Sequence, residues 1–509
     1  MPQFCLEQES FFAFKINYLL TSDYYIFGTV YTFCMLFNSI DFAFYFIIVT
    51  VAYFLLPHRY RWILLLSASC YFYMAFVPIY ILILGFTIVI DYFAGIYIEK
   101  AEGKKRKMLL ICSLIANIGV LVVFKYYNFL NESLGYMLNN AGYQNPVPYL
   151  SILLPIGLSF HTFQAMSYTI EVYRGNQKAE QHFGIYSLYV MFYPQLVAGP
   201  IERPQNILSQ MHAKHEFDYN RVVSGLQLML WGFFKKLVVA DRLSIYVNSI
   251  YGHPELHNGS SVAIASLFFA IQIYCDFSGY SDIAIGCARI MGYDLMINFR
   301  RPYFSKSISE FWSRWHISLS TWFRDYLYIP LGGNRVPKYR VYLNLMIVFL
   351  VSGIWHGANY TFILWGALHG FYLLCGLQFN KLRSGFTHRL HISSRVNNLL
   401  SIVLTIILVT FAWIFFRATS IKDAFTLVTN LKTIGQVPFL GDGISNMAHC
   451  VLAIALLFMV EYKMEYLSDR FNLLTHKIIW VRWSFLVISV FVILLFGVFS
   501  GGQFIYFQF

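Results

Sequence analysis

Charged residues are scarce in this chain, and no polar stretch is long enough to form a separate soluble domain. Only 12% of the 509 residues are charged and 58% are hydrophobic, whereas a typical globular protein is about 25% charged. Apolar runs long enough to cross a bilayer as helices recur along most of the chain. The composition therefore excludes an ordinary globular protein and predicts an all-α, polytopic membrane protein.

Other absences exclude further classes of protein. The eight cysteines form no C-x-x-C pair, and most lie in apolar runs, which argues against a disulfide framework or a zinc site. No internal repeat is evident, whereas an inverted repeat would have favoured a transporter. The net charge of +12 comes from basic residues in short loops, as the positive-inside rule requires. We therefore expect contact with membrane lipids and no nucleic-acid partner.

The loops and apolar runs predict the organisation of the chain. Residues 1–34 carry several acidic side chains, do not resemble a cleaved signal peptide, and form an N-terminal extension of uncertain status. Residues 35–509 form a single transmembrane domain of about eleven spans plus re-entrant or interfacial helices. Basic residues at both flanks of Phe183–Val197 predict such a re-entrant segment. The run Val222–Phe234 ends at two lysines and is short for a full span.

The segment Ser307–Arg335 contains the first of two Trp-His pairs. Ser307 and Glu310 match a capping box and predict the start of a helix. At helical spacing, aromatic side chains gather on one face, and His316 lies among them. We expect this helix to lie at the membrane surface, because it is too charged to span a bilayer.

The segment Val341–Leu377 contains the second pair. Its apolar run carries His356 roughly 22 Å into the hydrocarbon layer, with Gly353 and Gly357 beside it and Asn359 nearby. Ionisable groups are costly at this depth, so His356 is a functional-site hypothesis. No third ligand stands at metal-binding spacing beside either histidine, and we expect no metal site.

Other buried polar residues leave alternatives open. Asp276 and Asp282 are either a catalytic acid pair or hydrogen-bonded structural groups, and the structural interpretation is favoured. His161 and His369 lie in apolar runs and are predicted to be core histidines bonded to carbonyls. A buried histidine suits acyl transfer, because neutral imidazole accepts the proton of an attacking hydroxyl. The same proton logic suits a proton-coupled transporter.

Several longer motifs remain to be explained, and they are MLFNSIDF, LPIGLSFHTFQAMSYTIEVYR, FYPQLVAGPIERP, WGFFKKLVVADR, YCDFSGYSDIAIG, NFRRPYFSKSISEFWSRWHISLSTWFRDYLYIPLGGNR, SGIWHGANYTFILWGALHG and FIYFQF. Together they resemble the membrane-bound O-acyltransferase family, in particular its bacterial branch that acetylates alginate. The resemblance covers nearly all of residues 35–509. It implies a ring of helices around a thinned centre and a central tunnel. It also implies that His356 is the active-site histidine and His316 the second one. His161 departs from the family, where tyrosine is more usual.

From the residues and the resemblance together, we expect an O-acetyltransferase of a bacterial cell membrane. Acetyl-CoA is the expected donor, and hydroxyls of an exported or cell-wall polysaccharide are the acceptors, reached directly or through a periplasmic partner. His356 is the expected general base and His316 orients the donor or stabilises the oxyanion, with Arg314 and Asn359 as donor contacts. The alternatives are peptidoglycan O-acetylation, D-alanyl transfer to teichoic acid, a polysaccharide-precursor transporter, and a non-catalytic scaffold.

Overall fold

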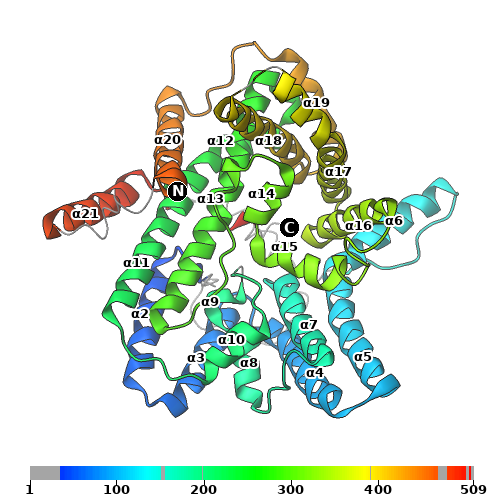
Figure 1. Cartoon of the computed structure of the whole chain (residues 1–509), viewed down its shortest axis with the longest axis vertical. Coiled ribbons are helices and arrows are strands. Elements are labelled where there is room, and N and C mark those ends of the chain that lie inside the picture. Colours follow the sequence, from blue (N-terminus) through cyan, green and yellow to red (C-terminus); the bar gives the residue numbers. More distant parts are fainter. Residues whose placement is uncertain are drawn as a thin grey trace, which may run out of the picture. The chain divides into compact units, whose positions relative to one another are not determined.

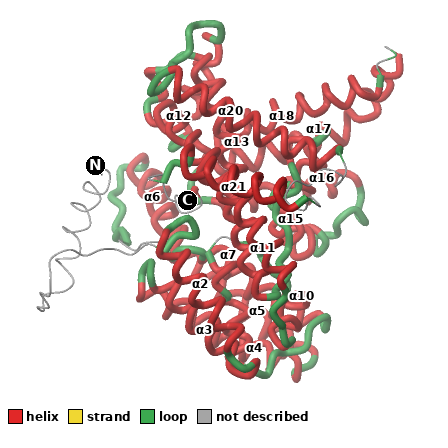
Figure 2. Tube along the Cα trace, turned by 90° about the vertical axis from the view of Figure 1, so that its left-hand side faces the viewer, coloured by secondary structure: helices red, strands yellow, loops and turns green. Residues whose placement is uncertain are grey.

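The computed structural model describes residues 35–150, 155–197, 199–389, 391, 393–467, 478–499 and 504–505. These residues form helices joined by turns and loops, and their β-pairing is limited to an isolated bridge between Ile434 and Gln436 (Figure 2). The predicted all-α fold is confirmed for this part of the chain. Residues 1–34 lie outside it, so their division from a single domain of residues 35–509 stays a prediction.

The α-helices follow one another along the chain with short connections. They are α2 (Ile40–Leu55), α3 (His58–Met74), α4 (Ile81–Lys100), α5 (Gly103–Leu121), α6 (Tyr127–Asn140), α7 (Leu158–Arg174), α8 (Phe183–Met191), α9 (Tyr193–Leu196), α10 (Pro204–His212), α11 (Tyr219–Phe233), α12 (Asp241–Gly252), α13 (Gly259–Met291), α14 (Ile308–Arg314), α15 (Ile317–Phe323), α16 (Lys338–His356), α17 (Tyr360–Arg389), α18 (Ser394–Arg417), α19 (Ile421–Asn430), α20 (Ile444–Tyr466) and α21 (Ile479–Phe496). Short 3-10 helices are η1 (Pro78–Tyr80), η4 (Pro254–Leu256), η5 (Pro302–Phe304) and η7 (Leu431–Thr433). The π-helical segments η2 (Val122–Tyr126), η3 (Phe234–Ala240) and η6 (Arg324–Tyr328) continue α5, α11 and α15.

Within the described residues, nine helices are long and apolar enough to cross a bilayer. They are Pro78–Lys100, Gly103–Asn140, Tyr219–Gly252, Gly259–Met291, Lys338–His356, Tyr360–Phe379, Ser394–Arg417, Ile444–Tyr466 and Ile479–Phe496. Helix α2 is apolar but only 16 residues long. The multi-pass membrane architecture is confirmed, whereas the count of about eleven spans stays a prediction.

Helix α13, the longest of the uninterrupted α-helices among the described residues, packs closely against α11 (Figure 1). Glycines face each other along this contact. A Cβ on Gly232 would lie 2.6 Å from the carbonyl oxygen of Gly279, and a Cβ on Gly286 would lie 2.7 Å from that of Gly225. Small residues at such positions let membrane helices approach until their backbones touch. The α11–α13 pair is therefore held by backbone contact that a larger residue would disrupt.

One predicted helix end is wrong. The run Val222–Phe234 does not stop at Lys235 and Lys236, because the helix continues through both lysines as η3 and then α12. The continuous segment Tyr219–Gly252 has 34 residues and is long enough to cross a bilayer. The prediction failed because the two lysines end the apolar run in the sequence, and their carboxylate partners are not evident from the run itself.

The two lysines are buried because carboxylates pair with both of them. Lys235 Nζ lies 2.6 Å from Asp282 Oδ2. Lys236 Nζ lies 2.6 Å from Asp276 Oδ1 and 2.8 Å from Asp241 Oδ1. Pairing of this kind is what makes ionisable groups tolerable inside a membrane protein. The favoured structural interpretation of Asp276 and Asp282 agrees with these ion pairs.

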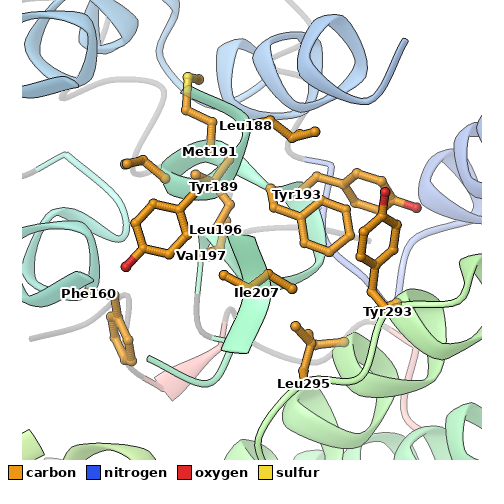
Figure 3. Close-up of a cluster of buried hydrophobic side chains, with 14 of the residues drawn as sticks. Phe160, Leu188, Tyr189, Met191, Tyr193, Leu196, Val197, Ile207, Tyr293 and Leu295 are labelled. Carbon is orange, nitrogen blue, oxygen red and sulfur yellow. The ribbon is translucent and has the colours of Figure 1, made fainter. Parts of the chain in front are cut away.

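The region predicted to be re-entrant consists of two short helices, α8 and α9, which meet at Phe192. Neither is long enough to cross a bilayer alone. Figure 3 shows their apolar side chains gathered with Phe160, Tyr293 and Leu295 in a buried cluster. The amide of Tyr193 donates a hydrogen bond to Ser69 Oγ over 3.0 Å, which fixes the break between the helices to α3.

Candidate active site

His316 occupies a break between α14 and α15, with left-handed backbone angles (φ 43°, ψ 55°). The sequence predicts one continuous helix here, and that prediction is wrong, because α14 ends at Arg314 and α15 begins at Ile317. The expected place of this segment at the membrane surface stays a prediction. His316 is fully buried and Trp315 is 1% exposed, and Figure 1 shows α14 and α15 among α13, α16 and α17. The predicted helix start is confirmed, because Ser307 Oγ accepts a hydrogen bond from the amide of Glu310 over 3.1 Å.

The break has a local cause in the extended segment that precedes α14. The amide of Arg300 donates to the carbonyl of Arg314, and the amide of Ile317 donates to the carbonyl of Asn298, both over 2.9 Å. These bonds take backbone groups on either side of His316 out of the helical pattern. Non-glycine residues seldom adopt a left-handed conformation, and they keep it only where the surroundings impose it.

Asn298 and Ser318 fix this turn from the side. Ser318 Oγ donates to Asn298 Oδ1 over 2.6 Å and accepts from the amide of Ile201 over 3.0 Å. Both side chains are buried, at 1% and 0% exposure. The position of His316 is therefore tied to the extended segment before α14 and to the chain before α10. Helical periodicity does not identify Asn298 or Ser318, because it does not reveal a hydrogen bond between a helix and an extended segment.

His356 is the last residue of α16, and two glycines allow α16 and α17 to meet there. A Cβ on Gly353 would lie 2.3 Å from the carbonyl oxygen of Phe362, and a Cβ on Gly366 would lie 2.3 Å from that of Phe349. Gly357 packs under the Phe362 ring in an extended conformation. These glycines thus serve close helix packing, which brings α17 against the end of α16 at His356.

The two histidines meet on one indole. The ring of Trp355 lies 4.9 Å from the His356 ring and 6.2 Å from the His316 ring, centroid to centroid. Phe160 of α7 packs on both His316 and Trp355, at 6.1 and 5.4 Å. His356 is 5% exposed. Two Trp-His pairs that are distant in the chain therefore share one buried aromatic contact, whereas the functional role of the two histidines stays a prediction.

Lys125 is part of this site, and the sequence reading missed it. Its Nζ donates to the carbonyls of Trp355 and His356 over 2.7 and 3.0 Å, and the neighbouring Tyr126 hydroxyl donates to the carbonyl of Ile354 over 2.7 Å. Both residues belong to the π-helical segment η2, and π-bulges are frequent at functional sites. A single lysine inside an apolar run was the signal that could have identified it.

The two weaker candidates make structural contacts. Arg314 bridges two carboxylates, with Nη2 2.7 Å from Glu310 Oε1 and Nη1 2.8 Å from Glu465 Oε1, which joins α14 to α20. Asn359 Oδ1 accepts from the amide of Thr361 over 3.0 Å at the start of α17. Its Nδ2 donates to the carbonyl of Thr419 over 2.9 Å. Their roles toward a substrate stay predictions.

The two remaining buried histidines differ from each other. His161 packs against Tyr73 at 6.1 Å in a T-shaped contact. His369 of α17 is fully buried, and its Nδ1 accepts a hydrogen bond from Trp312 Nε1 over 3.2 Å. The sequence predicted a backbone carbonyl as the partner of His369, and a carbonyl would require the imidazole to donate. In the structure Nδ1 instead accepts a hydrogen bond from an indole N–H.

Comparison with known proteins supports the resemblance to the membrane-bound O-acyltransferase family. Residues 180–420 match the model of the MBOAT, membrane-bound O-acyltransferase family. A probable alginate O-acetylase, AlgI, of Pseudomonas aeruginosa is 38% identical over 79% of this chain and 75% of its own length. The chain belongs to the membrane-bound O-acyltransferase family. It is thus a multi-pass membrane enzyme that transfers acyl groups to oxygen, and the resemblance read from its motifs is confirmed.

Other members of the family have different acceptors. A peptidoglycan O-acetyltransferase of Helicobacter pylori is 33% identical over 80% of this chain and 81% of its own length. A teichoic acid D-alanyltransferase of Bacillus subtilis is 27% identical over 51% of this chain and 68% of its own length. The match to the D-alanyltransferase is both shorter and weaker, whereas the two O-acetyltransferases match over similar lengths.

Proposed function

We propose that this protein transfers acetyl groups from a thioester donor to hydroxyls of an exported or cell-wall polysaccharide of the alginate type, at the bacterial cell membrane. The observation that carries the proposal is the packing of His316 and His356 on one buried indole, that of Trp355, in a chain similar to alginate O-acetylases. Burial of this site excludes water, which would otherwise hydrolyse the thioester.

His356 acts as the general base. Its neutral imidazole takes the proton of the sugar hydroxyl while the hydroxyl oxygen attacks the thioester carbonyl carbon. When the tetrahedral intermediate collapses, the carbon–sulfur bond breaks and the imidazolium gives its proton to the departing thiolate. The products are an acetyl ester and a free thiol. His316 orients the donor or stabilises the oxyanion of the intermediate.

The donor in this proposal is acetyl-CoA on the cytoplasmic side. The acceptor is reached directly or through a periplasmic acetyltransferase partner.

Arg314 and Asn359 are proposed to contact the acyl donor. For Arg314, this role can be separated by mutation from its ion pair with Glu465. Arg314→Met raises the KM for acetyl-CoA if Arg314 binds the donor, whereas Glu465→Gln does not. If Arg314 only joins α14 to α20, both variants lower thermal stability and leave KM unchanged.

Peptidoglycan O-acetylation is the second candidate function. The identity to the peptidoglycan O-acetyltransferase of Helicobacter pylori and the length it covers support it. Both candidates use the same donor and the same histidines, so they differ only in the acceptor. Supplying purified protein with either an alginate oligosaccharide or a peptidoglycan fragment, and measuring acetyl ester formation on each, separates them.

The test of the proposed function uses the whole chain in lipid nanodiscs with acetyl-CoA labelled in its acetyl group. We expect thioester loss and acetyl transfer from the unaltered protein and none from His356→Ala. His253→Ala is the matched control, because His253 is a solvent-exposed histidine. Full activity of a well-folded His356→Ala variant would contradict the mechanism. Movement of labelled polysaccharide precursor across the bilayer without thioester loss would favour a transporter.

A further inference from the structure

Three buried N–H groups near His356 have no hydrogen-bond acceptor among the described residues. They are Nε1 of Trp355, Nε1 of Trp365 and Nε2 of His369. Trp355 is 4% exposed, and Trp365 and His369 are fully buried. Buried indole N–H groups usually find a partner, so two indoles that lack one beside the same histidine form an unusual arrangement.

The hydrogen bond from Trp312 determines which nitrogen of His369 carries a proton. Because Trp312 Nε1 donates to His369 Nδ1 over 3.2 Å, Nδ1 is the acceptor of the neutral imidazole. The proton of the neutral ring therefore lies on Nε2. His369 thus offers a second donor, Nε2–H, from the side of the ring opposite to Nδ1.

Ring contacts connect these donors to His356. The Trp365 ring lies 5.1 Å from the His356 ring and 5.0 Å from the His369 ring, so it stands next to both imidazoles. Trp355 contacts His356 at 4.9 Å. The three donors therefore form a row. It begins at Trp355, whose ring contacts both His316 and His356, and continues through Trp365 to His369 at the interface between α14 and α17.

The three groups that lack a partner all have the same hydrogen-bonding role. Each of the three groups is a hydrogen-bond donor without an acceptor, so each needs an oxygen or nitrogen lone pair. An unpaired buried donor is unfavourable, and folded proteins leave few such groups. A ligand that brings two or three oxygen lone pairs would satisfy them together, whereas a purely aliphatic chain would satisfy none.

We propose that the N–H groups of Trp355, Trp365 and His369 form a subsite that binds oxygen atoms of the substrate beside His356. This subsite rests on the proposed function and deepens it. The oxygen has two possible sources with the same chemistry, the carbonyl of the acyl thioester or the hydroxyl and ring oxygens of the acceptor sugar. His369 and Trp365 bind and orient these oxygens, and His356 performs the proton transfer.

A matched pair of substitutions at His369 isolates the Nε2–H donor. The amide of asparagine reaches the Nδ1 position, so His369→Asn keeps an acceptor for Trp312 and loses the donor. The longer glutamine reaches the Nε2 position, so His369→Gln keeps a donor and loses the acceptor. A structural role predicts that His369→Asn is at least as stable and as active as His369→Gln. The subsite predicts the opposite order for activity.

The experiment uses the whole chain in nanodiscs with labelled acetyl-CoA and an unacetylated alginate oligosaccharide as probes. We expect acetyl transfer to fall about tenfold or more in His369→Asn and in Trp365→Phe, and to be largely retained in His369→Gln. Trp480→Phe is the control, because Trp480 is exposed at the surface. Melting temperatures are measured for every variant, so that loss of folding is separated from loss of binding.

Two readouts identify the source of the oxygen. If the subsite binds the thioester carbonyl, the variants slow thioester loss without oligosaccharide and raise the KM for acetyl-CoA. If it binds the sugar, thioester loss without oligosaccharide is unchanged and the KM for the oligosaccharide rises. Equal, undiminished transfer in His369→Asn and Trp365→Phe overturns the subsite.

A binding titration separates failure of the subsite from failure of the proposed function. Binding of each probe is followed by tryptophan fluorescence, which needs no turnover. If the unaltered protein binds a probe without transferring acetyl groups, the proposed function fails, and weaker binding to His369→Asn than to His369→Gln still supports the subsite. Equal binding by these two variants, or no binding of either probe by the unaltered protein, overturns it.

Discussion

Lys125 Nζ lies 3.0 Å from the backbone carbonyl oxygen of His356 and 2.7 Å from that of Trp355. The last carbonyls of a helix have no partner within the helix, and a cation at this end is favourable. Lys125 therefore caps α16 at the residue proposed as the base. Its own position is set by the π-helical segment η2, which interrupts a long apolar helix.

Removing this cap should impair catalysis more than binding. In Lys125→Met we expect kcat to fall roughly tenfold to a hundredfold, because hydrogen bonds from a charged group contribute about 1.5–3 kcal/mol. KM for acetyl-CoA should change little, because Lys125 bonds the backbone of His356 and Trp355. Lys105→Met, which alters an exposed lysine in the first turn of α5, is the control. A raised KM with unchanged kcat would show that Lys125 contacts the donor instead.

The left-handed backbone of His316 gives a second prediction. His316→Ala and His316→Gly both remove the imidazole, and acetyl transfer should fall by about a hundredfold or more in each if His316 supports the oxyanion. Alanine in the left-handed region costs about 1–2 kcal/mol, whereas glycine adopts it freely. We therefore expect His316→Gly to have the higher melting temperature. Recovery of activity in His316→Gly would mean that the backbone conformation, and not the ring, is what the site needs.

The buried charges near η3 give a third prediction. Lys236→Met leaves Asp241 and Asp276 without a counter-ion, and breaking a buried ion pair costs about 3–5 kcal/mol. We expect this variant to lose folded protein in a size-exclusion assay in detergent. Adding Asp241→Asn and Asp276→Asn should restore it, because the unpaired charges are then gone. If the triple variant is no more stable than Lys236→Met, the cluster has another role.

The sequence predicted those features that depend on local composition. The helical fold, the multi-pass architecture and the start of α14 at Ser307 follow from hydrophobic length and from a capping pattern of adjacent residues. The meeting of His316 and His356 was expected from the resemblance to a family, because no rule of local spacing relates two segments so far apart.

The features that were missed depend on contacts between distant segments. The break at His316 requires Asn298, the buried lysines of η3 require aspartates on α13, and Lys125 gains its role from the end of α16. Helical periodicity describes one helix at a time, so it read His316 as part of a continuous helix. A lysine in an apolar run signals a buried partner, but it does not indicate which one.

Glu202 gives a pH dependence that can be tested. Its carboxylate is fully buried and accepts hydrogen bonds from Asn206 Nδ2 over 2.7 Å and from the amide of Met296. Burial raises the pKa of this carboxyl from its ordinary 4.5 to about 7, although both hydrogen bonds act in the other direction. Between these two values the folded protein keeps a proton that the unfolded chain has released. The stabilisation is therefore complete below pH about 4.5 and is lost as the pH rises through 7.

The comparison of Glu202→Gln with the unaltered protein isolates this effect. Glutamine cannot ionise, so the unaltered protein should lose melting temperature relative to Glu202→Gln as the pH is raised from about 5 to about 8. Glu216→Gln is the control. The Glu216 carboxyl is exposed and its pKa is lowered by the hydrogen bond from Lys214, so it stays ionised throughout this range. If the melting temperatures of Glu202→Gln and of the unaltered protein change with pH in the same way, Glu202 is already ionised in the folded state. Its two hydrogen bonds would then outweigh the effect of its burial.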